Sequence, residues 1–182
     1  FGLLAPLYGH LARDPHPAAM MKKRAPRVYR WVERMNRASQ DAQEYFDCDT
    51  DFFQKNEIPE TLIEVLRVLS QDFVPETIAS AKCLNLWLSE QNPTTGSPAV
   101  FQLGTSPLGN VEFQVRDRLI KAAVVPYRHF QLQRIHQIFD EVETKVQMQI
   151  KQMLESCGMA NLLNIRLNRL IGRGDNLEVW LD

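Results

Sequence analysis

Two histidines have the spacing that is most suggestive of metal or proton chemistry. His129 and His136 lie seven residues apart, so they share one face of a helix, and Asp140 follows His136 by one turn. Metal ligation on a helix usually requires two ligands three or four residues apart together with further ligands. Only His136 and Asp140 form such a pair. We therefore interpret them as an ordinary hydrogen-bonded helix surface and predict no metal site.

The potential nucleophiles also lack the context that catalysis requires. Cys48, Cys83 and Cys157 lie far apart and form no Cys-x-x-Cys motif, so the sequence indicates neither a disulfide framework nor a structural zinc site. Cys83 and Cys157 stand among apolar residues and are predicted to be small core residues. Ser97 and Ser106 belong to no nucleophile elbow. The sequence therefore predicts no catalytic residue in this chain.

A glycine-containing segment near the end of the chain spells two familiar short motifs. Arg173, Gly174 and Asp175 match an adhesion tripeptide, but a motif of only three residues often occurs by chance. Glycine and aspartate at these positions favour a turn. Gly172 and Gly174 lack the strand, third glycine and helix of a dinucleotide site. We predict only a turn over residues 172–176.

Composition and charge restrict the class of protein. The 182 residues are 45% hydrophobic, which is enough for a folded core. No apolar run approaches the roughly 20 residues needed to cross a bilayer. The first residues lack a secretory signal, so we expect a cytoplasmic protein without a membrane span.

The basic residues are concentrated in the N-terminal part of the chain. Residues 1–37 hold eight Lys or Arg against two Asp or Glu, which leaves 13 against 20 in the remainder. No nucleic-acid motif accompanies these basic residues, so we predict no nucleic-acid partner. We expect a solvated basic face that pairs with a following acidic stretch. The basic set is Lys22, Lys23, Arg24, Arg27, Arg30, Arg34 and Arg37, and the acidic set is Asp41, Glu44, Asp47, Asp49 and Asp51.

The sequence predicts that residues 1–38 form two neighbouring antiparallel helices. The apolar positions of both follow the i, i+3, i+4, i+7 spacing of one helix face. They are Leu4, Leu7, Tyr8 and Leu11, then Val28, Trp31, Val32 and Met35. Residues 14–17 are expected to end the first helix, and the second to begin at Met20 or after Ala25. Phe1 is not Met and no N-cap residue precedes it, so we expect upstream sequence.

The remaining sequence divides into an acidic linker, 39–57, and a mostly helical extension, 58–182. Helices are predicted from Ile58 to Phe73, with Pro75 as the stop or as the start of a further helix to about Glu90. Alternation over 111–125 predicts a hairpin. One long helix is predicted from Tyr127 to Cys157, ended by Gly158. Residues 160–182 predict a second hairpin, with a short helix over 160–171 as the alternative.

The front of the chain resembles the late helices of the C-terminal domain of glutathione transferases. The resemblance rests on the run that begins Phe1-Gly-Leu-Leu-Ala-Pro-Leu-Tyr and on a pattern in the next helix. The family's Ala-Pro-x-Val-x-x-Trp-x-x-Arg-Met pattern is met by Ala25, Pro26, Val28, Trp31, Arg34 and Met35. The match covers about 37 residues, and the family's Ser/Thr-x-x-Asp capping box is absent.

The resemblance implies a mainly α fold, a helical bundle of the glutathione transferase C-terminal type with a helical extension and one or two small hairpins. It implies that glutathione is the cosubstrate of the parent protein, held by a thioredoxin-like N-terminal domain that this chain lacks. The helical domain would supply the wall for a small hydrophobic electrophile, with Tyr8, His10 and Arg13 as polar contacts. The same resemblance implies a homodimer. By itself the chain should be inactive.

A noncatalytic reading stays open beside this one. Metaxin-like proteins carry a similar Phe-Gly-x-Leu helix and a later helix with a Pro-x-x-x-x-x-x-x-Arg pattern. They serve as interaction scaffolds. The long extension after residue 38 is compatible with such a role.

Overall fold

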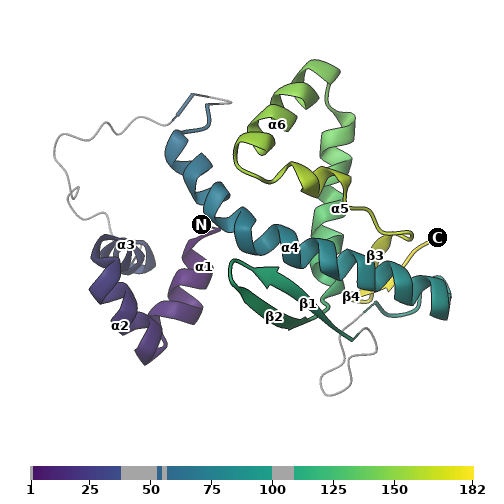
Figure 1. Ribbon diagram of the computed structural model, residues 1–182, viewed down its shortest axis with the longest axis horizontal. Helices are drawn as coiled ribbons and strands as arrows, with labels where there is room; N and C mark the ends of the chain where they lie inside the picture. Colours follow the sequence, from purple (N-terminus) through teal and green to yellow (C-terminus); the bar gives the residue numbers. More distant parts are fainter. Residues whose placement is uncertain (1, 38–52, 55–56, 100–108) are drawn as a thin grey trace. The chain divides into compact units, whose positions relative to one another are not determined.

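A computed structural model describes residues 2–37, 53–54, 57–99 and 109–182 (Figure 1). The chain forms two compact units, residues 1–52 and 53–182. Apart from 53–54 and 57, the expected linker 39–57 lies outside the described residues, together with its acidic stretch. Among the helices that are described, none combines the length and apolar character needed to cross a membrane.

The first unit is helical, as its apolar spacing predicts. It contains α1 (Leu4–Pro6), which continues as a π-helix η1 (Leu7–Ala12), and then α2 (Pro15–Arg24) and α3 (Pro26–Arg37). Residues 14–17 follow the end of η1 at Ala12, as expected, and α3 begins after Ala25, as expected. The alternative start at Met20 is wrong, because Asp14 is the N-cap and Pro15 the first residue of α2. Proline is suited to that position, where its missing N–H would have had no helical partner.

The two apolar stripes of the first unit lie against each other. Both α1 and η1 contact α3, and η1 also contacts α2. Val32 of α3 is fully buried, and Leu4, Trp31 and Met35 are half-buried. Leu11 remains 38% exposed at the edge of this packing. The expected adjacency of the two helical segments is therefore present.

The second unit is built on one 32-residue helix, α4 (Glu60–Gln91), so the expectation of two helices divided at Pro75 is wrong. Pro75 cannot donate to the carbonyl of Gln71. The helix nevertheless continues, because its buried face runs through the proline, with Val74 before it and Thr77 after it. Asn92 then ends the helix in the left-handed conformation, with φ of 40°.

The hairpin expected over 111–125 is confirmed as β1 (Asn110–Val115) and β2 (Arg118–Ala123), paired antiparallel. Val111 and Phe113 are buried and β1 packs on α4. These alternate residues form the inward face of the strand, as period-two patterning requires.

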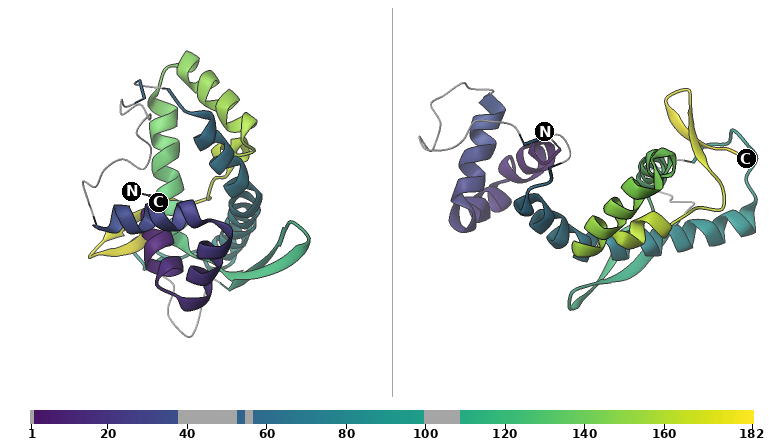
Figure 2. Two further views of the ribbon diagram at one scale, coloured as in Figure 1. Left: turned by 90° about the vertical axis from the view of Figure 1, so that its left-hand side faces the viewer. Right: turned by 90° about the horizontal axis from the view of Figure 1, so that it is seen from above.

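The single helix expected from Tyr127 to Cys157 is wrong. The structure has two helices, α5 (Pro126–Glu141) and α6 (Thr144–Ser156), separated by extended backbone at Val142 and Glu143. The Gln147 side chain donates a 3.0 Å hydrogen bond to the carbonyl of Phe139. It thus provides a donor for one of the last backbone carbonyls of α5. Because of the break, α6 turns back beside α5 (Figures 1 and 2), and Met153 and Leu154 pack in a core cluster with α4 residues.

The C-terminal segment contains a short helix and a hairpin. A 3₁₀ helix, η2 (Ala160–Asn164), is followed by β3 (Ile171–Gly174) and β4 (Leu177–Trp180), which pair antiparallel. The second hairpin is thus confirmed, but it occupies only the end of residues 160–182, since its first strand begins at Ile171. The turn is Asp175 and Asn176, both with positive φ, rather than the whole of 172–176.

The larger core of the second unit lies where α4 meets both hairpins and α5. Trp180 of β4 is fully buried and stacks on Trp87 of α4, with ring centroids 5.8 Å apart. The remaining members of the cluster are Leu84, Leu88, Ala99, Val111, Phe113, Val124 and Ile171. Mainly helical structure with two small hairpins is therefore the observed fold class.

Candidate functional site

Two of the three predicted contact residues form a polar pair in the first unit. The Arg13 guanidinium donates a 3.0 Å hydrogen bond to the Tyr8 hydroxyl. It also lies 5.6 Å from the centroid of the Tyr8 ring. Tyr8 is half-buried and Arg13 is exposed, so the pair presents a hydroxyl and a cation at the edge of an apolar helical surface. Such a pair suits a ligand with an anionic or strongly polar group beside an aromatic body.

The π-helix explains why these two residues meet. Tyr8 and Arg13 are five residues apart, and a π-helix has i to i+5 hydrogen bonding, so its turn is wider than that of an α-helix. Pro6 precedes the widened turn and Gly9 lies inside it, and both are poor α-helix formers. His10 is exposed and lies outside the hydrogen bond that joins Tyr8 and Arg13. The structure thus brings two of the three predicted residues together.

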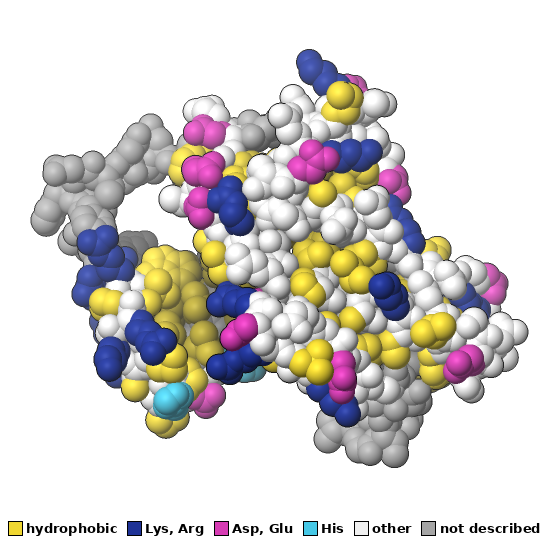
Figure 3. All heavy atoms as spheres, in the orientation of Figure 1, with side chains coloured by type: hydrophobic (Ala, Val, Ile, Leu, Met, Phe, Trp, Pro, Cys, Tyr) yellow, Lys and Arg dark blue, Asp and Glu magenta, His cyan; other side chains and the backbone are white. Residues whose placement is uncertain are grey.

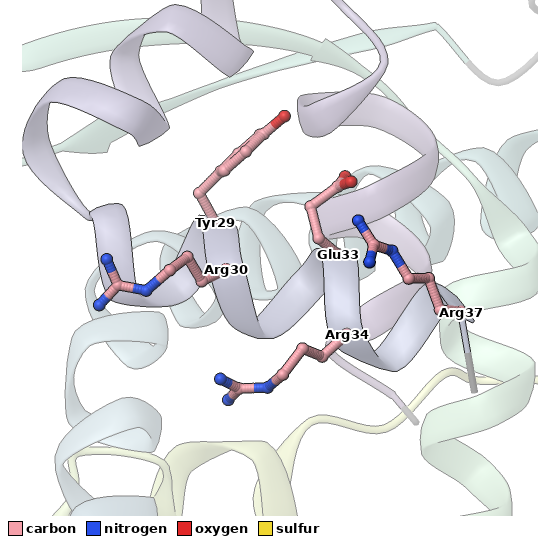
Figure 4. A pocket seen from close by; sticks show the side chains of 5 residues that line it. All are labelled: Tyr29, Arg30, Glu33, Arg34 and Arg37. Atoms are coloured by element: carbon pink, nitrogen blue, oxygen red, sulfur yellow. The ribbon is translucent and has the colours of Figure 1, made fainter. Parts of the chain in front are cut away.

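A shallow basic hollow of about 350 Å³ lies along α3. Its lining residues are Tyr29, Arg30, Glu33, Arg34 and Arg37 (Figure 4). Lys22 of α2 sits over the Tyr29 ring, with Nζ 4.8 Å from the centroid. Figure 3 shows dark blue side chains spread over this unit. Three arginines and a lysine against one glutamate give this face a net positive charge, and the acidic stretch expected to pair with it lies outside the described residues.

The interpretation of His129 and His136 as surface residues is wrong. Both are buried, with exposed fractions of 2% and 4%. His129 Nε2 lies 2.9 Å from Ser80 Oγ on α4, and His136 Nε2 lies 2.8 Å from the carbonyl oxygen of Leu162 in η2. The shared face of α5 therefore points inward and joins α5 to α4 and η2.

The environment of these histidines disfavours proton-transfer chemistry at neutral pH. Burial, reinforced by the Arg128 cation, lowers the pKa of His129 from 6.5 to about 4. Burial, assisted by the Arg166 cation, also lowers the pKa of His136, against opposing effects of the Leu162 hydrogen bond and Asp140. A base with so low a pKa is poorly matched to neutral pH, and the burial of Ser80 and His129 blocks access by a substrate. Their contact is therefore structural.

The other chemical candidates are also structural in the part of the chain that is described. Cys157 is fully buried, and burial raises the pKa of the Cys83 thiol, which disfavours a thiolate at Cys83. Within residues 2–37, 53–54, 57–99 and 109–182, no three His, Cys, Asp or Glu side chains gather as metal ligands would. Cys48 lies outside the described residues.

Comparison of the chain with protein-family models, with curated proteins and with solved structures gives no match.

Sequence reasoning did not anticipate the contacts of Lys22 with Tyr29 and of His129 with Ser80. Each joins two helices, so periodicity within one helix contains no signal for it. A partial signal did exist for His129: a histidine on the same helix face as Leu132, His136 and Phe139 lies on the side that is buried.

Proposed function

We propose that this chain is the hydrophobic cosubstrate-binding part of a glutathione transferase-like protein. In the parent protein, glutathione would be conjugated or transferred to a small electrophile, and an N-terminal thioredoxin-like domain would hold the glutathione. The observation that carries this proposal is the Tyr8 and Arg13 pair at the edge of the packed α1, η1 and α3 helices. No cofactor is assigned to the chain itself.

The chemistry of such a transfer divides naturally between two surfaces. The thiol must become a thiolate, which requires hydroxyl donors or a helix N-terminus near the sulfur. The electrophile requires an apolar wall and a polar contact that fixes its orientation. The first unit offers the second kind of surface, with Leu4, Trp31 and Met35 half-buried and Tyr8 with Arg13 at the edge. We assign the thiolate-stabilising part to the N-terminal domain.

The proposal is tested first by what the isolated chain should fail to do. The 182-residue chain should not be retained on immobilised glutathione and should not conjugate glutathione to an aromatic chloride. Turnover by the chain alone would refute the division of the site between two domains.

A second measurement tests the binding role directly. Equilibrium dialysis with a dinitrophenyl carboxylate should show binding that is about two- to tenfold weaker in Tyr8→Phe and in Arg13→Gln, the range for one lost hydrogen bond. Tyr29→Phe is the matched control, since Tyr29 lies on the basic hollow of α3 and not at the pair. Equal binding by all four proteins would contradict the assignment of Tyr8 and Arg13.

A noncatalytic, metaxin-like interaction module is the second candidate. It is favoured by the large apolar side chains that the second unit exposes, among them Leu86, Ile138 and Met148 at 64% or more. Exposed apolar side chains mark a protein-binding site where they form one contiguous patch, so such a patch is what this candidate requires. A full-length parent that has no conjugating activity would favour this candidate.

A further inference from the structure

The first half of α4 has an apolar side that remains exposed. Large aliphatic and aromatic side chains recur there at intervals of three or four residues, so they line one side of the helix and of the turn just before it. Each of these side chains is between 36% and 53% exposed. They are named the α4 face, and they are Ile58, Leu62, Val65, Val68, Leu69 and Phe73.

The same stretch of helix also has a buried side. Ile63 and Val74 are buried in a cluster with Cys157, and residues of α6 and η2 pack against them. Among the described residues, α6 and η2 therefore cover one apolar side of the helix and leave the α4 face open. A helix that is apolar on most of its circumference is normally covered on all of those sides.

The α4 face is a contiguous patch of useful size. If a fully exposed large side chain presents roughly 200 Å², the six residues expose about 500 Å² at their observed fractions. The largest apolar patch on a monomeric protein is typically about 300 to 600 Å² and is often functional, above all where polar residues border it. The chemistry of the border therefore indicates what the patch binds.

An acidic row borders the α4 face. Glu60, Glu64 and Asp72 occupy a row of positions four residues apart, in which Val68 is the remaining member, so they lie along one line of the helix surface. Their side chains are 75%, 60% and 55% exposed. Glu64 also lines a hollow of about 300 Å³ in the α4 face. Figure 3 shows acidic and apolar side chains next to each other over the first turns of α4.

The arginines near this row leave it with a net negative charge. The two glutamates share Arg67, and Asp72 lies 3.8 Å from Arg116. Residues 57–73 hold four Asp or Glu against one Lys or Arg, so the acids still outnumber the bases by two when Arg116 is added. Ion pairs between exposed side chains contribute little stability, so cations of a partner can replace them.

An apolar row beside an acidic row complements one kind of partner. An amphipathic helix that docks on another protein presents apolar anchors at spacings of three, four and seven residues, which match the spacing of the α4 face. Lysine or arginine along the flank of such a helix would meet the acidic row. Nucleic acid or an anionic lipid surface would be repelled by the same row.

We propose that the α4 face and its acidic row bind a basic amphipathic helix of another protein. The apolar anchors of that helix lie on the α4 face, and its lysine or arginine side chains pair with Glu60, Glu64 and Asp72. This inference is independent of the role proposed for the first unit, and it holds whether or not the parent protein conjugates glutathione.

Fluorescence anisotropy with the complete 182-residue chain and two labelled synthetic peptides tests the proposal. The first peptide has about five helical turns, with leucine at the i, i+3, i+4 and i+7 positions and lysine on the flanks. The second has glutamate in place of every lysine. The lysine peptide should bind, and its affinity should fall as salt is added. The glutamate peptide should bind about tenfold more weakly or not at all.

Two alanine substitutions locate the apolar contact. Leu62→Ala and Leu69→Ala together should weaken binding of the lysine peptide by about tenfold, because they remove apolar area and keep a good helix former at exposed positions. Leu86→Ala is the matched control, since Leu86 is 64% exposed on the same helix outside the α4 face. It should leave the affinity unchanged.

Neutral substitutions locate the charged contact and do not depend on the alanine variants. Glu64→Gln and Asp72→Asn should each weaken binding by about two- to fivefold, the range for one exposed ion pair. They should also reduce the dependence of the affinity on salt. Glu90→Gln is the control, because Glu90 is exposed near the other end of α4 and should have no effect.

Several results would overturn the proposal. One is the absence of binding to the lysine peptide, and another is equal binding of the two peptides. Binding that survives the alanine pair would place the contact elsewhere. Flotation with phosphatidylglycerol vesicles, or a dimer in sedimentation, would assign the α4 face to a lipid surface or to a second copy if the alanine pair abolished it.

Discussion

Acidification should destabilise the second unit through His129, whose imidazole is 2% exposed and lies 2.9 Å from Ser80 Oγ. Burial and Arg128 lower its pKa to about 4 in the folded chain, whereas the unfolded chain has the ordinary value of 6.5. Between these two values the unfolded chain binds a proton that the folded chain does not bind. Stability is therefore lost as the pH falls through 6.5, and the loss levels off below 4.

The magnitude follows from the two pKa values. Relative to neutral pH, protonation of the unfolded chain at this one site costs the fold about 1 kcal/mol at pH 5.5 and about 2 kcal/mol at pH 4.5. His129→Gln removes the titration and keeps an amide nitrogen near the Ser80 hydroxyl. We expect this variant to be about 1 kcal/mol less stable at pH 7 through altered packing. Its stability should also depend less steeply on pH than that of the parent chain.

Urea unfolding at a series of pH values provides the assay. The fluorescence of Trp87 and Trp180, which stack in the core of the second unit, reports the transition. His10→Gln is the control, because His10 is exposed in the first unit and its substitution should leave the slope unchanged. If His129→Gln and the parent chain lose stability equally between pH 6.5 and 4.5, the assignment of a buried neutral His129 is refuted.

Two further substitutions test the backbone of the second unit. Gly158→Ala should lower the free energy of unfolding by about 1 to 3 kcal/mol, because Gly158 has φ of +76° and an added Cβ would lie 2.9 Å from Ser70 Oγ. Gly9→Ala, where a Cβ meets nothing within 4 Å, should show no such loss in the same denaturation assay. Pro75→Ala should raise the urea midpoint by the equivalent of about 1 kcal/mol, since it restores a hydrogen-bond donor to the carbonyl of Gln71 inside α4. An unchanged or lower midpoint would show that the missing N–H of Pro75 does not destabilise the helix.

Apolar spacing predicted most of the helical structure and both hairpins, because these depend on local pattern. Leu4 and Leu7 are helical, as are Trp31 and Met35, and Val111 and Phe113 face inward from a strand. The errors fall where long-range packing decides. Val142 and Glu143 interrupt a continuous helical pattern because α6 packs with α4, and Pro75 does not interrupt one because the buried face of α4 continues past it.

Tyr8 and Arg13 were named from the sequence, but the geometry that joins them was not predictable from it. Tyr8 and Arg13 were expected to be polar contacts, but an α-helical spacing does not predict that they hydrogen-bond to each other. Their contact depends on the wider turn of η1, which no pattern of residue types specifies. The buried histidines show the same limitation, since their partners Ser80 and Leu162 come from other elements of the second unit.

The central claim is that this chain provides the electrophile's surface and not the glutathione site. Heteronuclear NMR of the 182-residue chain, titrated separately with an aromatic carboxylate and with glutathione, tests it most directly. The aromatic carboxylate should shift the resonances of Tyr8, Arg13 and their neighbours on η1 and α3, and glutathione should shift none of them. Saturable shifts with glutathione, or none with the aromatic ligand, would contradict the account.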